Sequence, residues 1–372
     1  GEASYAFIAL LIGIGVWSPL LGRLYDKISV KLLMPIGGLA YAAGLITVSL
    51  ATSPIIILVA IALCLGPAMV LAGGLAANTL AARWFERRRG RALGIASVAS
   101  SAGGFVIVPI ATALIQTYDW RTALMALGIG IGLIVVSMGL FVARDRPTAE
   151  QLAHFGENET EQEEMSRAAA IWSFKALLGS ANFWLITMGV GLLLASDQAV
   201  LTSQYPYLID ISFSPAEAAS VIAAMTGSAI AGKLIVGYLA EKFDIRWLYG
   251  LVALFHVALL VVFLAGPSYL FMLIFSAIFG AAVGGIYPVW SVLISKGFGT
   301  ASFGTAFGAM ALFTQVLAIG FVAFIGNSYD NIGDYTFAFS CFIGAIILGM
   351  LAISVVRLPS RAAPSAAGAN AP

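Results

Sequence analysis

The chain has 372 residues, of which 60% are hydrophobic and only 10% are charged, and its formal net charge is +1. A water-soluble core of this length would need far more polar surface to cover it, and a nucleic-acid-binding protein is usually strongly basic. The composition excludes both classes and predicts a protein that crosses the lipid bilayer several times. Cys64 and Cys341 lie in apolar runs, so neither is expected to form a disulfide or to bind a metal.

Apolar runs of lipid-spanning length predict eleven transmembrane helices. The hydrocarbon core of a bilayer requires about 20 apolar residues per helix. The runs that meet this length are, in chain order, 3–21, 32–51, 54–80, 92–116, 121–143, 182–207, 215–239, 247–265, 268–294, 304–326 and 335–356. The predicted fold class is therefore an all-α polytopic membrane protein whose two chain ends lie on opposite sides of the membrane.

Basic residues gather on one side of this arrangement. Of the 19 Lys and Arg residues, 17 lie in loops and the tail of one face, whereas Arg121 lies on the other face and Lys233 inside a span. The segment 83–91 alone holds five arginines. Because cytoplasmic loops are enriched in Lys and Arg, we expect the C-terminus and the connection 144–181 to be cytoplasmic and the protein to reside in the plasma (inner) membrane.

The longest polar connection divides the spans into two groups. Residues 144–181 include five closely spaced glutamates, a composition typical of a solvated linker. We therefore expect an N-terminal helical half at 1–143, a cytoplasmic linker at 144–181 and a C-terminal helical half at 182–357. The tail at 358–372 is rich in Ala, Pro and Ser, and we expect it to be disordered.

Three short sequence matches recur at nearly one offset. The matched segments are GRLYDK at 22–27 with GYLAEK at 237–242, GRALG at 90–94 with GTAFG at 304–308, and the glycine pair at 73–74 with that at 284–285. Offsets of 215, 214 and 211 residues indicate two parallel halves. The second half holds six spans and the first five, so we expect the counterpart of span 182–207 to lie upstream of Gly1.

These motifs carry a family resemblance. GRLYDKISVK at 22–31 resembles the loop signature between the second and third helices of the major facilitator superfamily, and GYLAEKFDIR at 237–246 is the weaker copy. RWFERRRGRALGIASVASSAGG at 83–104 resembles the fifth-helix signature of the monocarboxylate transporter family and of oxalate–formate antiporters, although here Ala92 precedes Leu93. The resemblance implies two six-helix halves, with eleven of the twelve helices present, and transport of small organic anions.

Lys233 is the leading candidate for substrate binding. An ammonium inside a span is costly unless it faces a cavity or a partner. The run from Gly232 to Gly237 resembles the eighth-helix segment in which monocarboxylate transporters carry a substrate-binding arginine, so the resemblance implies that Lys233 binds a carboxylate. Lysine lacks the bidentate fork of arginine, and Ala229 stands where the family has an acidic residue. The alternative is that the Lys233 amine snorkels to the basic face beside Glu241.

Asp197 is the candidate for proton coupling. It lies fifteen residues into its span among Leu and Ala, and a carboxylate in apolar surroundings suits a group that loads and releases protons. The alternative is a structural hydrogen bond to a neighbouring helix. Gln315, Tyr287 and Asn78 are further candidates for the substrate path, although isolated polar residues in helices more often bond across helix contacts. His256 is expected to be a packed side chain.

The repeated motifs at the basic face are assigned to a cytoplasmic gate. We expect Asp26 and Glu241 to lie within reach of the N-terminal ends of facing helices, where the helix dipole stabilises a carboxylate. The resemblance implies that this contact holds the inner gate shut in the outward-open state. The candidate gate residues are Gly22, Asp26, Lys27, Arg91, Gly237, Glu241 and Lys242.

Motifs of metal-dependent hydrolases, P-loop enzymes and serine hydrolases are missing from the sequence. We therefore expect no enzyme activity, no cofactor, no metal and no nucleic-acid partner. The predicted function is secondary active transport of a small organic anion by alternating access. Because the spans hold one cation, a monocarboxylate is favoured over a dianion. H+ is the expected coupling ion, and a monomer is the expected functional unit. Two alternatives stay open: an anion exchanger or exporter of amphipathic compounds on the same fold, and a non-transporting membrane sensor.

Overall fold

The computed structural model describes residues 2–85, 88–148, 150–151 and 171–358. All eleven predicted spans are confirmed as helical stretches long and apolar enough to cross a membrane. Before the polar connection the helices are α1 (Glu2–Lys27), α2 (Val30–Leu50), α3 (Pro54–Ala60), the π-helix η1 (Ile61–Leu65), α4 (Gly66–Ala72), α5 (Gly74–Trp84), α6 (Arg89–Thr117), α7 (Trp120–Ser137) and the π-helix η2 (Met138–Val142).

After it come α10 (Phe174–Leu178), α11 (Ala181–Asp210), α12 (Pro215–Lys242), α13 (Ile245–Ala265), α14 (Tyr269–Gly284), α15 (Ile286–Phe298), α16 (Phe303–Ile332) and α17 (Thr336–Ser354). The short helix α10 lies inside the predicted linker, where the Trp172 amide donates to the Ser302 hydroxyl at 2.8 Å. The glutamate-rich part of that linker and the predicted disordered tail lie outside the described residues.

Side chains cap the N-termini of several of these helices. At α12, Ser214 and Glu217 form a reciprocal capping box. At the turn between α6 and α7, Asp119 accepts hydrogen bonds from the Thr122 hydroxyl and from two backbone amides. These bonds, that of the Thr122 hydroxyl foremost, hold the pKa of Asp119 below its usual value. The cap is therefore ionised at neutral pH and fixes the turn.

Several helices run further than their sequence patterns predicted, and α1 and α12 are the two that carry the repeated motifs. α1 ends at Lys27 rather than at 21, and α12 ends at Lys242 rather than at 239. The repeated motifs are consequently helical, and only residues 28–29 connect α1 to α2. Neither motif contains a proline or an internal glycine, so charged residues continue the helix after it leaves the apolar region. The motif carboxylates Asp26 and Glu241 therefore project from rigid helices, not from loops.

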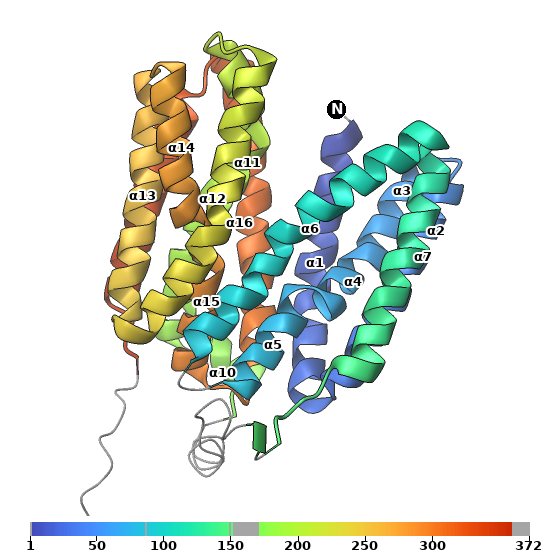
Figure 1. Ribbon diagram of the computed structural model, residues 1–372. Coiled ribbons are helices and arrows are strands. Elements are labelled where there is room, and N and C mark those ends of the chain that lie inside the picture. The colour runs from blue at the N-terminus through green and yellow to red at the C-terminus, as the bar shows by residue number, and fades with distance from the viewer. Residues whose placement is uncertain (1, 86–87, 149, 152–170, 359–372) are drawn as a thin grey trace, which may run out of the picture.

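The helices form two groups that meet at one end and diverge toward the other (Figure 1). One group holds α1 to α7 and the other holds α11 to α17. At the end where they meet lie the loops α1–α2, α5–α6, α12–α13 and α15–α16, with most of the described Lys and Arg residues, and we call it the basic end. Arg121 lies at the opposite end. The principal contacts between the groups are α1 against α16 and α6 against α12.

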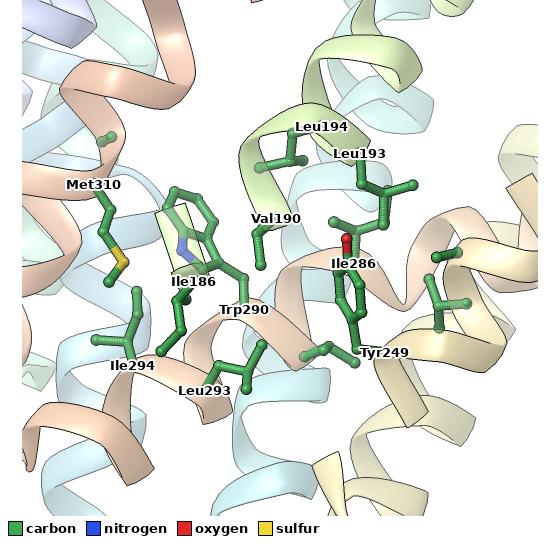
Figure 2. Close-up of a cluster of buried hydrophobic side chains, with 14 of the residues drawn as sticks. Ile186, Val190, Leu193, Leu194, Tyr249, Ile286, Trp290, Leu293, Ile294 and Met310 are labelled. Atoms are coloured by element: carbon green, nitrogen blue, oxygen red, sulfur yellow. The ribbon is translucent and has the colours of Figure 1, made fainter. Parts of the chain in front are cut away.

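A continuous apolar core holds the second group together. Figure 2 shows Val190 of α11 between the rings of Trp290 on α15 and Tyr249 on α13. The Trp290 ring stacks on Phe307 with 4.4 Å between centroids, and the Tyr249 hydroxyl donates to the Gly189 carbonyl at 2.6 Å. This core fixes the relative positions of α11, α13 and α15. These three helices also carry the polar residues Asp197, His256 and Tyr287.

The repeated glycine pairs lie where helices are interrupted. Gly73 separates α4 from α5 with a non-helical ψ of −142°, and Gly285 separates α14 from α15. The third sequence match therefore corresponds to one structural feature in both halves. Discontinuous helices of this kind commonly border the substrate sites of transporters.

The two groups differ in one neighbour of their repeated helices: a helix equivalent to α11 packs against them in the second group only, within the described residues. In the second group, α11 packs against both α16 and α17. The corresponding helices of the first group, α6 and α7, have no equivalent of α11 beside them within the described residues. The upstream helix that the repeat predicts therefore stays an expectation.

Candidate functional site

Glycines lie at the centre of both crossings between the groups. Where α6 crosses α12, a Cβ atom on Gly90 would lie 2.2 Å from the carbonyl oxygen of Gly237, and one on Gly237 would lie 2.6 Å from that of Gly90. Where α1 crosses α16, the equivalent distances for Gly22 and Gly304 are 2.3 and 2.4 Å. Only glycine permits such approach. We call these contacts the α6–α12 seam and the α1–α16 seam.

A carboxylate closes each seam at the basic end. Asp26 accepts hydrogen bonds from the Gly304 amide at 2.8 Å, from the Thr305 amide at 2.7 Å and from the Thr305 hydroxyl at 2.5 Å. Glu241 accepts from the Arg91 amide and from Arg91 Nε, both at 2.9 Å. Each carboxylate thus lies at the N-terminus of a helix in the other group, where the helix dipole favours it. We call these two contacts the carboxylate latches.

Lys27 and Lys242 lie apart from these latches. Both side chains are exposed at the basic end. The Lys242 ammonium lies 4.5 Å from the centroid of Tyr238 on its own helix, and within the described part of the chain Lys27 shows no contact across a seam. Five of the seven candidate gate residues therefore meet at the seams and latches, and their role in gating stays a prediction.

An interaction near the first latch was missed by the sequence analysis. Arg83, at the end of α5, donates to Asp145 at 2.9 Å and also to the Tyr25 carbonyl oxygen. Asp145 in turn accepts from the amide of Val30 at 2.8 Å, at the start of α2. These partners are far apart in the sequence, so no local pattern indicated them. The network ties α1, α2 and α5 together behind the α1–α16 seam.

Lys233 is buried at the α6–α12 seam. Its side chain is 6% exposed, and Nζ donates to the hydroxyls of Ser100 and Ser101, each at 2.7 Å. Within the described residues these two hydroxyls are its only hydrogen-bond partners, and it forms no ion pair with any of them. The ammonium therefore reaches from one group of helices to the other without a neutralising charge.

The snorkelling alternative for Lys233 is wrong. Side chains on a helix lean toward its N-terminus, and the N-terminus of α12 lies at the end opposite the basic end. The Lys233 carbonyl oxygen lies level with Gly94, whereas the serines that bind its amine lie six and seven residues further along α6, about 9–10 Å away at 1.5 Å per residue. The amine thus points away from Glu241, which is bound to Arg91 instead.

The repeat shows that this ammonium is not needed to form a seam. The counterpart of Lys233 in the first half is Ser18, at the common offset of 215. The Ser18 carbonyl oxygen would lie 2.1 Å from a Cβ on Gly308, as that of Lys233 would lie 2.5 Å from one on Gly94. Two equivalent backbone contacts thus carry a serine in one seam and a lysine in the other. The backbone contact is therefore shared by both seams, whereas the buried charge is present in the α6–α12 seam alone.

Asp197 lies in a separate polar cluster inside the second group. It is 6% exposed, and its Oδ1 lies 3.6 Å from Nε2 of His256 on α13. The Tyr287 hydroxyl lies within electrostatic reach of Asp197. His256 is buried, as expected, but it has a carboxylate neighbour that the sequence did not indicate.

Gln315 and Asn78 do not join Lys233. Gln315 packs beside Gly15 at the α1–α16 seam, 3.3 Å from where a Cβ on that glycine would lie. Asn78 is buried on α5, which packs against α4, α6 and α16. The structure thus places the four candidate substrate residues in four different places, and it adds Ser100 and Ser101, whose only sequence signal was their place in the fifth-helix motif.

Two groups of helices, crossing at two glycine seams with interrupted helices alongside, define a membrane transporter built from repeated halves. The chain matches the profile of the Major Facilitator Superfamily over residues 1–323, and it belongs to that superfamily.

Sequence relatives and solved structures agree with this assignment. The chain is 24% identical to monocarboxylate transporter 12 of Rattus norvegicus over 92% of this chain and 75% of that protein. It is also 24% identical to an MFS-type transporter of Gibberella moniliformis, over 92% of this chain and 81% of the relative.

Among solved structures, the fold is similar to that of the E. coli fucose:proton symporter, with a TM-score of 0.72 and 15% identity over 96% of this chain and 91% of that one. A proton:xylose symporter matches with a TM-score of 0.71 and 16% identity, over 96% of this chain and 86% of its own. These two likenesses show the shared fold.

Proposed function

We propose that this transporter carries small monocarboxylates together with H+, and that Lys233 binds the carboxylate. The observation that carries the proposal is the buried ammonium, whose described partners are two neutral hydroxyls. A buried charge without an opposite charge costs several kcal/mol. An anionic substrate removes that cost when it binds, while Ser100 and Ser101 hold the amine in place.

Three further observations support a monocarboxylate. Lys233 is the one Lys or Arg that lies deep inside a described span, and a single positive charge matches a monoanion better than a dianion. The charge is absent from the equivalent place at Ser18, so it is not explained by helix packing. Similarity to monocarboxylate transporter 12 over 92% of the chain points to the same class of substrate.

We further propose that the basic end faces the cytoplasm of the plasma (inner) membrane, because basic loops remain on that side. In this orientation the structure is the outward-open state, with both seams closed at the cytoplasmic end and the groups diverging outward (Figure 1). Rocking would open the seams and break the carboxylate latches. Each chain supplies both halves, so a monomer suffices, and we propose no catalytic role.

The test is uptake of labelled lactate or pyruvate into liposomes that contain the full chain. We expect accumulation when the outside is more acidic than the inside, because the proton gradient drives the anion inward. Liposomes without protein, and liposomes at equal pH on both sides, serve as controls. No uptake under any pH gradient would refute proton-coupled transport.

The same assay separates the alternatives. Counterflow of labelled anion that does not depend on pH would favour an exchanger. Absence of both uptake and counterflow, in protein that is inserted and folded, would favour a membrane sensor.

A further inference from the structure

Besides Lys233, the Asp197–His256 pair is the place where acidic, basic or histidine side chains are buried among the described spans. Both residues are more than nine-tenths buried, at 6% and 5% exposed. They come from α11 and α13, which lie within one group of helices, so the pair does not form or break when the groups rock. Lys233, by contrast, lies on the seam between the groups.

The imidazole has one nitrogen without a partner. His256 Nδ1 lies 2.9 Å from the Val252 carbonyl oxygen, and a carbonyl can only accept, so Nδ1 carries a hydrogen. His256 Nε2 has no hydrogen-bond partner in the described structure and faces Asp197 Oδ1 at 3.6 Å. A buried nitrogen left in this way requires an explanation. The open position is where one additional proton binds, on Nε2 or on the carboxyl group.

Charge balance decides how many protons the pair holds. With one proton the pair is neutral overall, and burial favours that proton on the carboxyl group, because neither side chain then carries a charge. Without it, one negative charge is left among apolar side chains, and with two protons one positive charge is left. Both charged forms are disfavoured by burial. The enclosed pair therefore keeps one proton, and it releases that proton only when water or a cation reaches it.

A polar route connects the pair to exposed surface. Tyr287 is 39% exposed, lies within electrostatic reach of Asp197 and is the second residue of α15, which begins directly after the break at Gly285. The helix α15 contacts α6 of the first group as well as α11, α12, α13 and α16. Tyr287 therefore belongs to a helix that touches both groups.

Several other titratable groups on the helices packed around the pair are hydrogen-bonded to residues other than Asp197 and His256. On α13 the Tyr249 hydroxyl binds Gly189, on α14 Tyr269 binds Ser220, and on α12 Lys233 binds the two serines. The other titratable residues on these helices are Lys175, Tyr205, Tyr207, Asp210, Glu217, Tyr238, Glu241, Lys242, Arg246, Lys296, Tyr329, Asp330 and Cys341.

We propose that Asp197 and His256 share the transported proton, and that this site is separate from the anion site at Lys233. The proton enters from water along Tyr287, is held between Asp197 Oδ1 and His256 Nε2, and leaves to water after the groups have rocked. The use of this proton in transport rests on the function proposed above. The existence of a shared, titrating proton does not.

Infrared spectroscopy of the full chain in lipid tests the pair without any substrate. The carbonyl stretch of a protonated carboxyl group should appear and disappear as pH is varied between about 5 and 8, the range of histidine chemistry. Asp197→Asn should remove this signal. In His256→Gln the signal should no longer change across that range, because the carboxyl group, having lost its imidazole partner, stays neutral.

Transport provides the second measurement. Asp197→Asn and His256→Gln should lose accumulation driven by a pH gradient but keep counterflow, which moves anions without net proton movement. The matched control is Ser276→Ala, a buried hydroxyl of α14 in the same group that has no partner in the described structure. It should keep both.

Two results would overturn the proposal. One is a wild-type spectrum in which no carboxyl signal titrates in this pH range. The other is a folded His256→Gln variant that titrates and accumulates anion as the wild type does. If instead no monocarboxylate is carried while the infrared signal behaves as expected, the proposed substrate is wrong and the proton site stands.

Discussion

Replacing Lys233 with glutamine is expected to abolish monocarboxylate binding while the protein still folds and inserts. Glutamine keeps a side-chain N–H donor for Ser100 and Ser101 but removes the charge that a carboxylate requires. Removing one partner of a buried, hydrogen-bonded charge pair costs about 2–5 kcal/mol, which corresponds to a loss of affinity of roughly 30-fold to several thousand-fold. Equilibrium binding of labelled pyruvate to purified protein measures this loss.

Two further variants make this result specific. Lys233→Arg keeps the positive charge and should recover part of the binding, although its planar fork requires a different fit. Ser18→Ala changes the equivalent position of the α1–α16 seam and should bind pyruvate as the wild type does. If Lys233→Gln binds pyruvate with unchanged affinity, Lys233 is a packing residue and the proposed anion site is wrong.

Replacing Gly90 with alanine is expected to force the α6–α12 seam apart. The added Cβ would lie 2.2 Å from the Gly237 carbonyl oxygen, and both atoms belong to helix backbones, so no rotamer change relieves the clash. Overpacking of this kind costs about 1–3 kcal/mol, which lowers the population of the closed seam by roughly 5-fold to 150-fold relative to the open one. The variant should favour the state that is open at the basic end and transport slowly.

Electron–electron distance measurements between spin labels check this shift. Ile95 on α6 and Ile235 on α12 are exposed near the seam and can carry the labels once Cys64 and Cys341 are replaced. The distance should increase in Gly90→Ala. Gly103→Ala is the matched control, because it makes the same change on the same helix with nothing within 4 Å of the new Cβ. An unchanged distribution in Gly90→Ala would contradict the close contact.

The spans and the repeat could be predicted from the sequence because each depends on local pattern. Long apolar runs can only be satisfied in lipid as helices, and the eleven runs gave the correct spans. The repeated glycines marked where helices approach closely, but the pairing of Gly22 with Gly304 and of Gly90 with Gly237 became evident only in the structure. The ends of α1 and α12 were placed too early, since a hydropathy pattern marks where lipid ends and not where the helix ends.

The polar contacts could be predicted only in part. Lys233 stood out because charge inside a span is rare, but its partners Ser100 and Ser101 depend on how α6 rotates against α12. The Asp197–His256 pair was not indicated for the same reason: a lone histidine in an apolar helix carries no sign of which neighbour it faces. Such contacts are set by helix rotation and depth, which a single sequence does not specify.

Comparing the two seams distinguishes the contacts that hold the groups of helices together from the residues to which we assign transport. Both seams use glycines and a carboxylate bound to a helix N-terminus, and both are explained by the need for the groups to approach closely and to part again. The positions 215 residues before Lys233 and His256 hold Ser18 and Tyr41, neither of which is a basic residue. Lys233 and His256 therefore break the repeat, and they belong to the sites to which we assign the anion and the proton.

The most direct test of the anion site compares a small monocarboxylate with its neutral amide. Pyruvate and pyruvamide, or lactate and lactamide, have nearly the same shape and differ chiefly in charge. If the Lys233 ammonium binds the carboxylate, the wild-type protein should bind the acid at least about tenfold more tightly than the amide, because charge-assisted hydrogen bonds are roughly twice as strong as neutral ones. Equal affinity for acid and amide would contradict the account.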